Sequence, residues 1–183
     1  MVRKTVFTRE DIIHAGFDLV DKQGLEQLTA RNLAMEIGSS TAPVYSNFSN
    51  MDELQRALVE DAIRRLLERT RSGKSGNGFL DMGLAVLDFA WDHPRWYSAL
   101  FLGKTHQPEP GFQIMEELLE VMGGLPDLAD LDDVERLIVL KKMALFTHGL
   151  ATDICVDHDG HHSREEWTML LDEVGNTILQ DAL

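Results

Sequence analysis

The sequence has 183 residues, 44% of them hydrophobic, and a net charge of −14 at pH 7. This length and apolar content support a sizeable core, divided over one or two small domains. A single cysteine excludes an intrachain disulfide, and no apolar stretch approaches the length of a membrane span. No apolar run follows the charged start of the chain. We therefore expect no secretory signal, no membrane partner and a cytoplasmic location.

The negative charge is concentrated in the second part of the chain. Residues 1–71 hold 10 Lys/Arg and 11 Asp/Glu, a balance of −1, whereas residues 72–183 hold 7 and 20, a balance of −13. Strong acidity argues against a nucleic-acid partner, but this argument does not apply to the near-neutral first part. If that part binds DNA, we expect few phosphate contacts and a shallow salt dependence.

The first predicted helix follows a short basic arm that contains Arg3, Lys4 and Arg9. Such an arm is compatible with a solvated terminus and equally with contacts to phosphates or to a minor groove. The helix is expected to begin after the N-cap residue Thr8 and to end at Gly24, after a cation in its last turn.

The next predicted elements are two short helices joined by a tight turn. Thr29 is the expected N-cap of the first helix, and Gly38 is expected to stop it. Ser39 or Ser40 would cap the second helix, which is expected to extend from Ser40 to Phe48. The alternative is a purely structural helical hairpin, but this spacing is typical of a helix-turn-helix whose second helix reads the major groove.

The second of these helices carries small, hydroxyl-bearing and aromatic groups and little apolar surface. Such groups suit close approach to base edges and phosphates. Pro43 is expected in the first turn, where proline is tolerated. The candidate DNA-contacting residues are Arg3, Lys4, Thr29, Ser39, Ser40, Thr41, Ala42, Pro43, Tyr45, Ser46 and Asn47.

A long helix is predicted from a capping box at Asn50 and Glu53 to about Arg71. The glycine-rich segment 72–78 that follows is predicted to be a flexible joint. It contains Gly-Lys-Ser, but Glu68 stands where a P-loop needs its first glycine, and a helix precedes the segment where a P-loop needs a strand. We therefore exclude nucleotide binding at this segment.

The rest of the chain is predicted to be helical, with loops rich in glycine and proline. No period-2 alternation indicates a strand, so the fold class is all-α. The expected helices cover residues 79–91, 94–102, 111–123, 131–155 and 164–181.

Aromatic and methionine side chains gather in the middle of these helices. Each one alone is best explained as core, but as a set with a few polar groups they suit an adaptable apolar pocket. The candidate pocket residues are Phe89, Trp96, Tyr97, Phe101, Met115, Met143, Phe146 and His148.

Possible metal ligands are concentrated between Cys155 and Glu166. Aligned as a calcium loop, Asp157, Asp159 and Glu166 occupy ligand positions, but Cys155 replaces the first aspartate. As a zinc site the segment lacks a regular i, i+4 pair on one helix. We favour a polar turn, with no metal and no cofactor. The alternative function is a metal-binding protein or metal-dependent hydrolase that uses the cluster from Cys155 to His162.

The chain resembles the TetR family of bacterial transcriptional regulators over about its first third. It departs from the family at two positions. The family usually has a lysine three residues after the aromatic that ends the recognition helix, where this chain has Met51, and Pro43 lies within the recognition helix. The His148-Gly149 pair is similar to one that recurs before the dimer contact in one TetR subgroup. The matching residues are Ile13, Ala15, Leu19, Gly24, Thr29, Leu33, Ala34, Gly38, Ser40, Tyr45, Phe48, Leu54 and Ala57.

The resemblance implies three parts: a helix-turn-helix domain over residues 1–50, a connecting helix over 51–71 and a helical effector-binding and dimerisation domain over 79–183. It implies a homodimeric regulator and not an enzyme, most simply a repressor. A small-molecule effector of unknown identity would release it from a palindromic operator in double-stranded DNA. The dimer interface is expected on the last two helices, at Leu137, Leu145, Trp167, Leu171, Val174 and Ile178.

Overall fold

The computed structural model describes residues 7–73, 77–103, 110–156 and 163–182, and these residues form helices and no strands. The all-α prediction with an N-terminal helix-turn-helix domain is confirmed. Short 3-10 turns lie at Leu25–Gln27 and Pro126–Leu128, and a π-helical turn at Ser98–Leu102 follows α6. The α-helices are α1 (Arg9–Gln23), α2 (Ala30–Glu36), α3 (Ala42–Asn47), α4 (Met51–Arg71), α5 (Gly78–Asp92), α6 (Pro94–Tyr97), α7 (Pro110–Gly123), α8 (Asp133–Val156) and α9 (Arg164–Gln180).

Local capping explains where α1 and α2 begin. The Thr8 hydroxyl accepts a hydrogen bond from the Asp11 backbone N–H, and the Asp11 carboxylate accepts one from the Thr8 N–H. The Thr29 hydroxyl accepts from the Asn32 N–H at 3.1 Å. These bonds satisfy N–H groups that have no partner inside the helix, as the sequence predicted.

The turn between α2 and α3 differs in detail from the prediction. Gly38 has a φ of +63°, and the Gly38 and Ser39 N–H groups donate back to the carbonyls of Met35 and Ala34. This glycine-dependent turn ends α2 and delays the next helix, so Thr41 stands at the N-cap position of α3. Its side chain makes no capping bond, whereas the Ser40 hydroxyl accepts from the Ala42 N–H at 3.4 Å. The helix predicted to read DNA is therefore Ala42–Asn47, shorter than predicted at both ends, with Pro43 in its first turn as expected.

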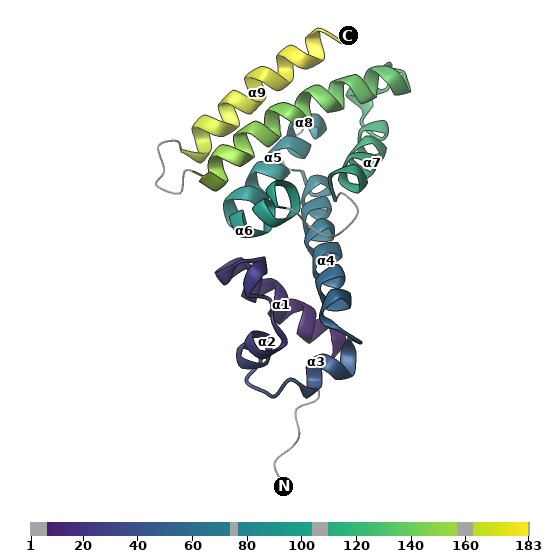
Figure 1. The fold of residues 1–183 in the computed structure, drawn as a ribbon. Coiled ribbons are helices and arrows are strands. Elements are labelled where there is room, and N and C mark those ends of the chain that lie inside the picture. The colour runs from purple at the N-terminus through teal and green to yellow at the C-terminus, as the bar shows by residue number, and fades with distance from the viewer. Residues whose placement is uncertain (1–6, 74–76, 104–109, 157–162, 183) are drawn as a thin grey trace.

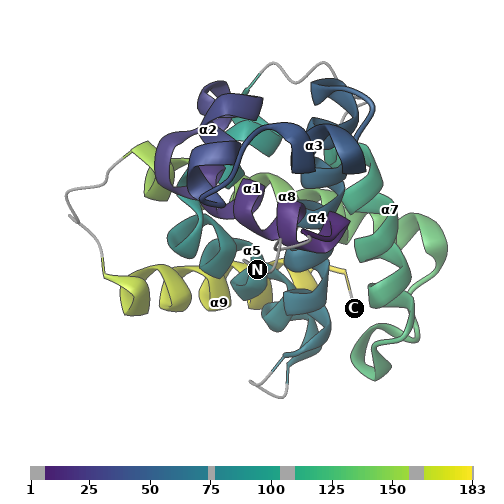
Figure 2. The ribbon, with the colours of Figure 1, turned by 90° about the horizontal axis from the view of Figure 1, so that it is seen from below.

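The helices form two parts that α4 connects. Helices α1, α2 and α3 lie at one end of the molecule, and α5 to α9 form the body at the other (Figure 1). Seen from the first end, α2 and α3 lie over the rest of the protein (Figure 2). The 21 residues of α4 span about 32 Å at the usual rise per residue.

Close packing between helices stabilises each of the two parts. Gly16 lets α1 approach α4, because a Cβ atom at that position would lie 2.9 Å from the side chain of Leu58. Gly83 similarly brings α5 against α9, where a Cβ atom would lie 3.0 Å from Leu171. In the described part of the chain, no helix is long and apolar enough to cross a membrane.

Candidate functional site

The surface formed by α2 and α3 exposes most of the candidate DNA-contacting residues. Thr29, Ser39, Ser40, Ala42, Tyr45 and Ser46 are exposed, Thr41 and Pro43 are half-buried, and Arg3 and Lys4 lie outside the described residues. Tyr45 is 54% exposed, although a large ring is costly to leave in water. The second half of α3 thus presents an aromatic and small groups to a potential partner.

Asn47, by contrast, is used inside the protein. Its amide donates to the carbonyls of Pro43 at 2.9 Å and Phe7 at 3.2 Å. The Ser46 hydroxyl also donates to the Pro43 carbonyl, at 2.9 Å. The Asn47 amide nitrogen therefore fixes α3 against Phe7, close to the start of α1, and is already engaged within the protein.

Two basic side chains near this surface are neutralised by ion pairs. Arg9 donates to the Asn47 carbonyl at 2.8 Å and to Glu53 at 2.9 Å. The Glu53 carboxylate also accepts from the Ser49 N–H at 2.8 Å, and this bond, followed by that from Arg9, lowers the pKa of Glu53 to about 2. Lys22 pairs with Glu36 at 2.6 Å.

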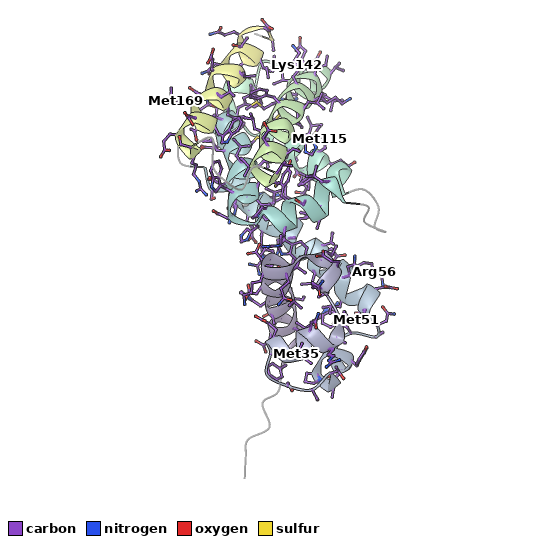
Figure 3. All side chains as sticks on the ribbon, turned by 60° about the vertical axis from the view of Figure 1, so that its left-hand side comes forward. Met35, Met51, Arg56, Met115, Lys142 and Met169 are labelled. Carbon is purple, nitrogen blue, oxygen red and sulfur yellow. The ribbon has the colours of Figure 1, made fainter. Side chains whose placement is uncertain are left out.

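Arg31 and Arg56 remain as cations without an ion pair among the described residues, and both are exposed. Arg31 lies in the first turn of α2 and Arg56 in the second turn of α4, where Figure 3 shows it above Met51. Met51 is half-buried at the first position of α4. The spacing of residues in the sequence does not distinguish these two arginines from the basic residues that form ion pairs.

The body of the protein contains a cavity of about 510 Å³. A volume of this size suits a drug-sized molecule. Of the candidate pocket residues, Tyr97, Phe101, Met115, Met143 and His148 line it. The other lining residues are Phe79, Met82, Gly83, Val86, Ile114, Leu118, Leu140, Lys141, Ala144, Leu145 and Thr147.

Three candidate pocket residues lie elsewhere. Trp96 is fully buried against α1, where its indole N–H donates to the Phe17 carbonyl at 3.1 Å and its ring stacks on Phe17 at 5.1 Å. Phe89 is also fully buried, 5.3 Å from the His93 ring. Phe146 is half-buried outside the cavity lining. The adjacent residues Trp96 and Tyr97 of α6 face different partners, and amino-acid composition does not predict which of them lines the cavity.

Polar groups of the cavity gather around α8. The Tyr97 hydroxyl lies 2.7 Å from Nδ1 of His148. Burial raises the pKa of Tyr97, so the phenol keeps its proton. Thr147 is 3% exposed, and its hydroxyl has no hydrogen-bond partner among the described residues. Lys141 is exposed at the edge of the cavity.

Helix α6 joins the cavity to α1, in the helix-turn-helix part of the molecule. Tyr97 lines the cavity, and its neighbour Trp96 is anchored on α1. Next to this anchor, Arg95 donates to the Asp21 carbonyl at 3.0 Å, and His93 lies 3.1 Å from the Asp21 carboxylate. A displacement of α6 at the cavity would therefore act directly on α1.

The surface of α8 and α9 is rich in exposed apolar side chains. Val134 (65%), Ile138 (49%) and Leu145 (76%) follow one side of α8, and Met169 (72%) and Leu170 (38%) lie on α9. The two helices lie side by side (Figure 1), and Met169 is on the outer side of α9 (Figure 3). An apolar patch of this kind marks an interaction surface. We call these five residues the α8–α9 patch.

The structure corrects the expected dimer interface in part. Leu145 lies in the α8–α9 patch, and Leu137 and Val174 are half-buried. The remaining three candidates, Trp167, Leu171 and Ile178, are 8%, 0% and 9% exposed. Their stripe of α9 packs against the protein's own core, so it is not available to a second copy.

The candidate metal cluster falls largely outside the described residues, which leave out 157–162. Cys155 is half-buried at the end of α8, where its thiol donates to the Pro94 carbonyl at 3.6 Å, and burial raises its pKa. Among the residues that the structure describes, no three His, Cys, Asp or Glu side chains gather as a metal site would require.

The chain is similar in sequence to a known regulator, but only over part of its length. No family model matches the chain. An uncharacterised HTH-type transcriptional regulator of Mycobacterium tuberculosis, Rv0681, is 29% identical over 103 residues, 54% of this chain and 47% of that protein. The match thus spans about half the length of that relative.

Solved structures match over nearly the whole chain. A transcriptional regulator from Rhodococcus sp. Rha1 is 23% identical, covers 96% of this chain and 97% of its own, and has a TM-score of 0.71. A TetR-family transcriptional regulator from Streptomyces coelicolor is 17% identical, covers 95% and 87%, and has a TM-score of 0.67. The chain has the fold of the TetR-family transcriptional regulators.

Proposed function

We propose that the protein is a sequence-specific DNA-binding regulator of transcription, a repressor that a small molecule releases from its operator. The observation that carries the proposal is the exposed face of α3, with Tyr45 at its centre, at the opposite end of α4 from a drug-sized cavity. The M. tuberculosis relative, a transcriptional regulator by name, supports it. We assign residues 1–50 to reading DNA, 51–71 to connection and 79–183 to ligand binding and dimerisation, with no enzymatic step.

We further propose that two copies pair through the α8–α9 patch. Its exposed apolar side chains would be covered by the same patch of a second copy, as a two-fold interface requires. Two recognition helices would then bind half-sites about 34–36 Å apart, one turn of DNA, and the operator would be palindromic.

The cavity would control this geometry through α6. A ligand that contacts Tyr97 and binds one position of α6 better than the other shifts the population toward that position. Because Trp96 fixes α6 to α1, the shift changes the spacing of the two reading ends and so weakens binding to the operator.

Selection of binding sites from a random duplex DNA pool tests the reading function. The wild-type chain should recover a palindrome, and Tyr45→Ala should lose that enrichment. Val156→Ala is the matched control, because Val156 is also exposed (76%) but lies at the end of α8. Recovery of no motif by the wild type, or the same motif by Tyr45→Ala, would contradict the proposal.

The salt dependence of operator binding tests which cations touch phosphate. Arg31 and Arg56 supply two unpaired cations per protomer, so a dimer that uses only these should give a slope of roughly −4 in log K against log salt. Participation of Arg3 and Lys4 would steepen the slope to roughly −7. The double variant Arg3→Ala, Lys4→Ala separates the two cases.

A further inference from the structure

Thr147 differs from the other threonines of α8 and α9. The hydroxyls of Thr152, Thr168 and Thr177 each donate to the carbonyl four residues earlier, at 2.7 to 3.0 Å. Thr147 sits on α8 between similar turns, yet its hydroxyl forms no such bond and is 3% exposed in the cavity wall. An unpaired buried hydroxyl costs free energy, so a retained one calls for a partner that binds there.

The neighbouring His148 supplies a second donor. The Tyr97 hydroxyl is buried, and Nδ1 of His148, at 2.7 Å, is its hydrogen-bond partner among the described residues. If Nδ1 carried the proton, the phenol proton would be left unsatisfied. The phenol therefore donates to Nδ1, which leaves the imidazole proton on Nε2 of a residue that lines the cavity.

The charge of the cavity selects against cations. Among the described residues that line it, none is acidic and Lys141 is the single charged side chain. The remaining lining is aromatic, methionine and aliphatic, which favours an apolar body with few polar groups. A cationic ligand would lose its hydration with no carboxylate to replace it.

From these observations we propose that the cavity binds an apolar molecule through one carbonyl-type oxygen, which accepts hydrogen bonds from the Thr147 hydroxyl and Nε2 of His148. This assignment rests on the proposed function, because it names the chemical class of the effector. A neutral ketone and a carboxylate both carry such an oxygen acceptor, so either type of ligand would satisfy the proposal. In the second case Lys141 would pair with the carboxylate at the edge of the cavity.

Four biphenyl probes of matched shape test the proposal by calorimetric titration of the full chain without DNA. The probes are 4-acetylbiphenyl, biphenyl-4-carboxylate, 4-ethylbiphenyl and biphenyl-4-methylammonium. We expect an oxygen-bearing probe to bind at least fivefold more tightly than 4-ethylbiphenyl, and the ammonium probe to bind most weakly. A preference for the carboxylate that Lys141→Met removes identifies an acid, and a preference for the ketone identifies a neutral effector.

Variant proteins assign the contact. Thr147→Val keeps the side-chain shape and should weaken the oxygen-bearing probe about five- to tenfold while leaving 4-ethylbiphenyl unchanged. Thr152→Val on the same helix is the control and should change neither affinity, because the Thr152 hydroxyl already donates to the backbone carbonyl of His148. Equal affinity for the acetyl and ethyl probes, no binding by any probe, or no effect of Thr147→Val would overturn the proposal.

Release of the protein from operator DNA is measured in a separate experiment. Failure of the proposed ligand contact can then be distinguished from failure of the proposed regulatory function. Oxygen-dependent binding without DNA release would leave the cavity chemistry intact and contradict the regulatory function. Release of DNA by 4-ethylbiphenyl as effectively as by 4-acetylbiphenyl would support regulation and overturn the assigned contact.

Discussion

Substitution of Trp96 by phenylalanine tests whether α6 is the joint between the cavity and the reading end. Trp96 is fully buried, donates to the Phe17 carbonyl at 3.1 Å and stacks on the Phe17 ring with an interplanar angle of 16°. Phenylalanine keeps one ring for stacking but removes the N–H and part of the indole. The change therefore isolates the hydrogen bond and the packing that fix α6 to α1.

The expected cost is about 2 kcal/mol of unfolding free energy. Loss of the hydrogen bond accounts for about 1 kcal/mol. A cavity of about 40 Å³ where the second ring was adds about 1 kcal/mol at 24 cal/mol per Å³. In a chain of this length the midpoint of thermal unfolding should fall by about 4–8 °C.

Urea denaturation at a fixed protein concentration measures the loss, and Trp91→Phe is the control. Trp91 is half-buried, and the Arg164 guanidinium lies 5.4 Å from its ring, so this variant should lose less than about 1 kcal/mol. Trp96→Phe should also reduce the change in operator affinity caused by effector. Equal losses in the two variants, or full effector response in Trp96→Phe, would refute the reasoning.

Three further predictions concern the reading end. The pKa of Glu53 is about 2 against an ordinary value of 4.5, so its contribution to stability is present above pH 4.5 and is lost as the pH falls toward 2. Between pH 5 and pH 3 the thermal midpoint should therefore fall further in the wild type than in Glu53→Gln. Met51→Lys should tighten operator binding at low salt and steepen the salt slope by about 2 for a dimer. Gly38→Ala, at a φ of +63°, should lose about 1–2 kcal/mol in urea denaturation, while Gly123→Ala, with open space around it and no positive φ, should be neutral or slightly stabilising.

Helix starts were predictable where the capping chemistry is local. Thr8, Thr29 and Asn50 each accept a hydrogen bond from an N–H three residues later, a relation fixed by the sequence alone. The start of α3 was not predictable, because Ser39, Ser40 and Thr41 are all competent N-caps. The choice among them depends on the back-bonded turn at Gly38.

The candidate site was predictable in composition but not in orientation. Tyr97 and Trp96 are adjacent aromatics, and only the packing of α6 between α1 and α8 sends one to the cavity and the other to the Phe17 carbonyl. Likewise, the apolar stripe that contains Leu171 is as compatible with a second copy as with the chain's own core. Because α5 approaches α9 closely at Gly83, this stripe packs against the chain's own core.

The separation of charge along α4 has a kinetic consequence. The near-neutral first part of the chain (residues 1–71) and the second part, with a balance of −13, lie toward opposite ends of the molecule, so the protein is an electric dipole with its acidic pole away from α3. In the field of DNA, approach by the body is repelled over about a Debye length, roughly 8 Å at physiological salt. For the proposed DNA-binding function, encounters in which the body approaches DNA first would be disfavoured, and encounters in which α3 approaches first would be favoured.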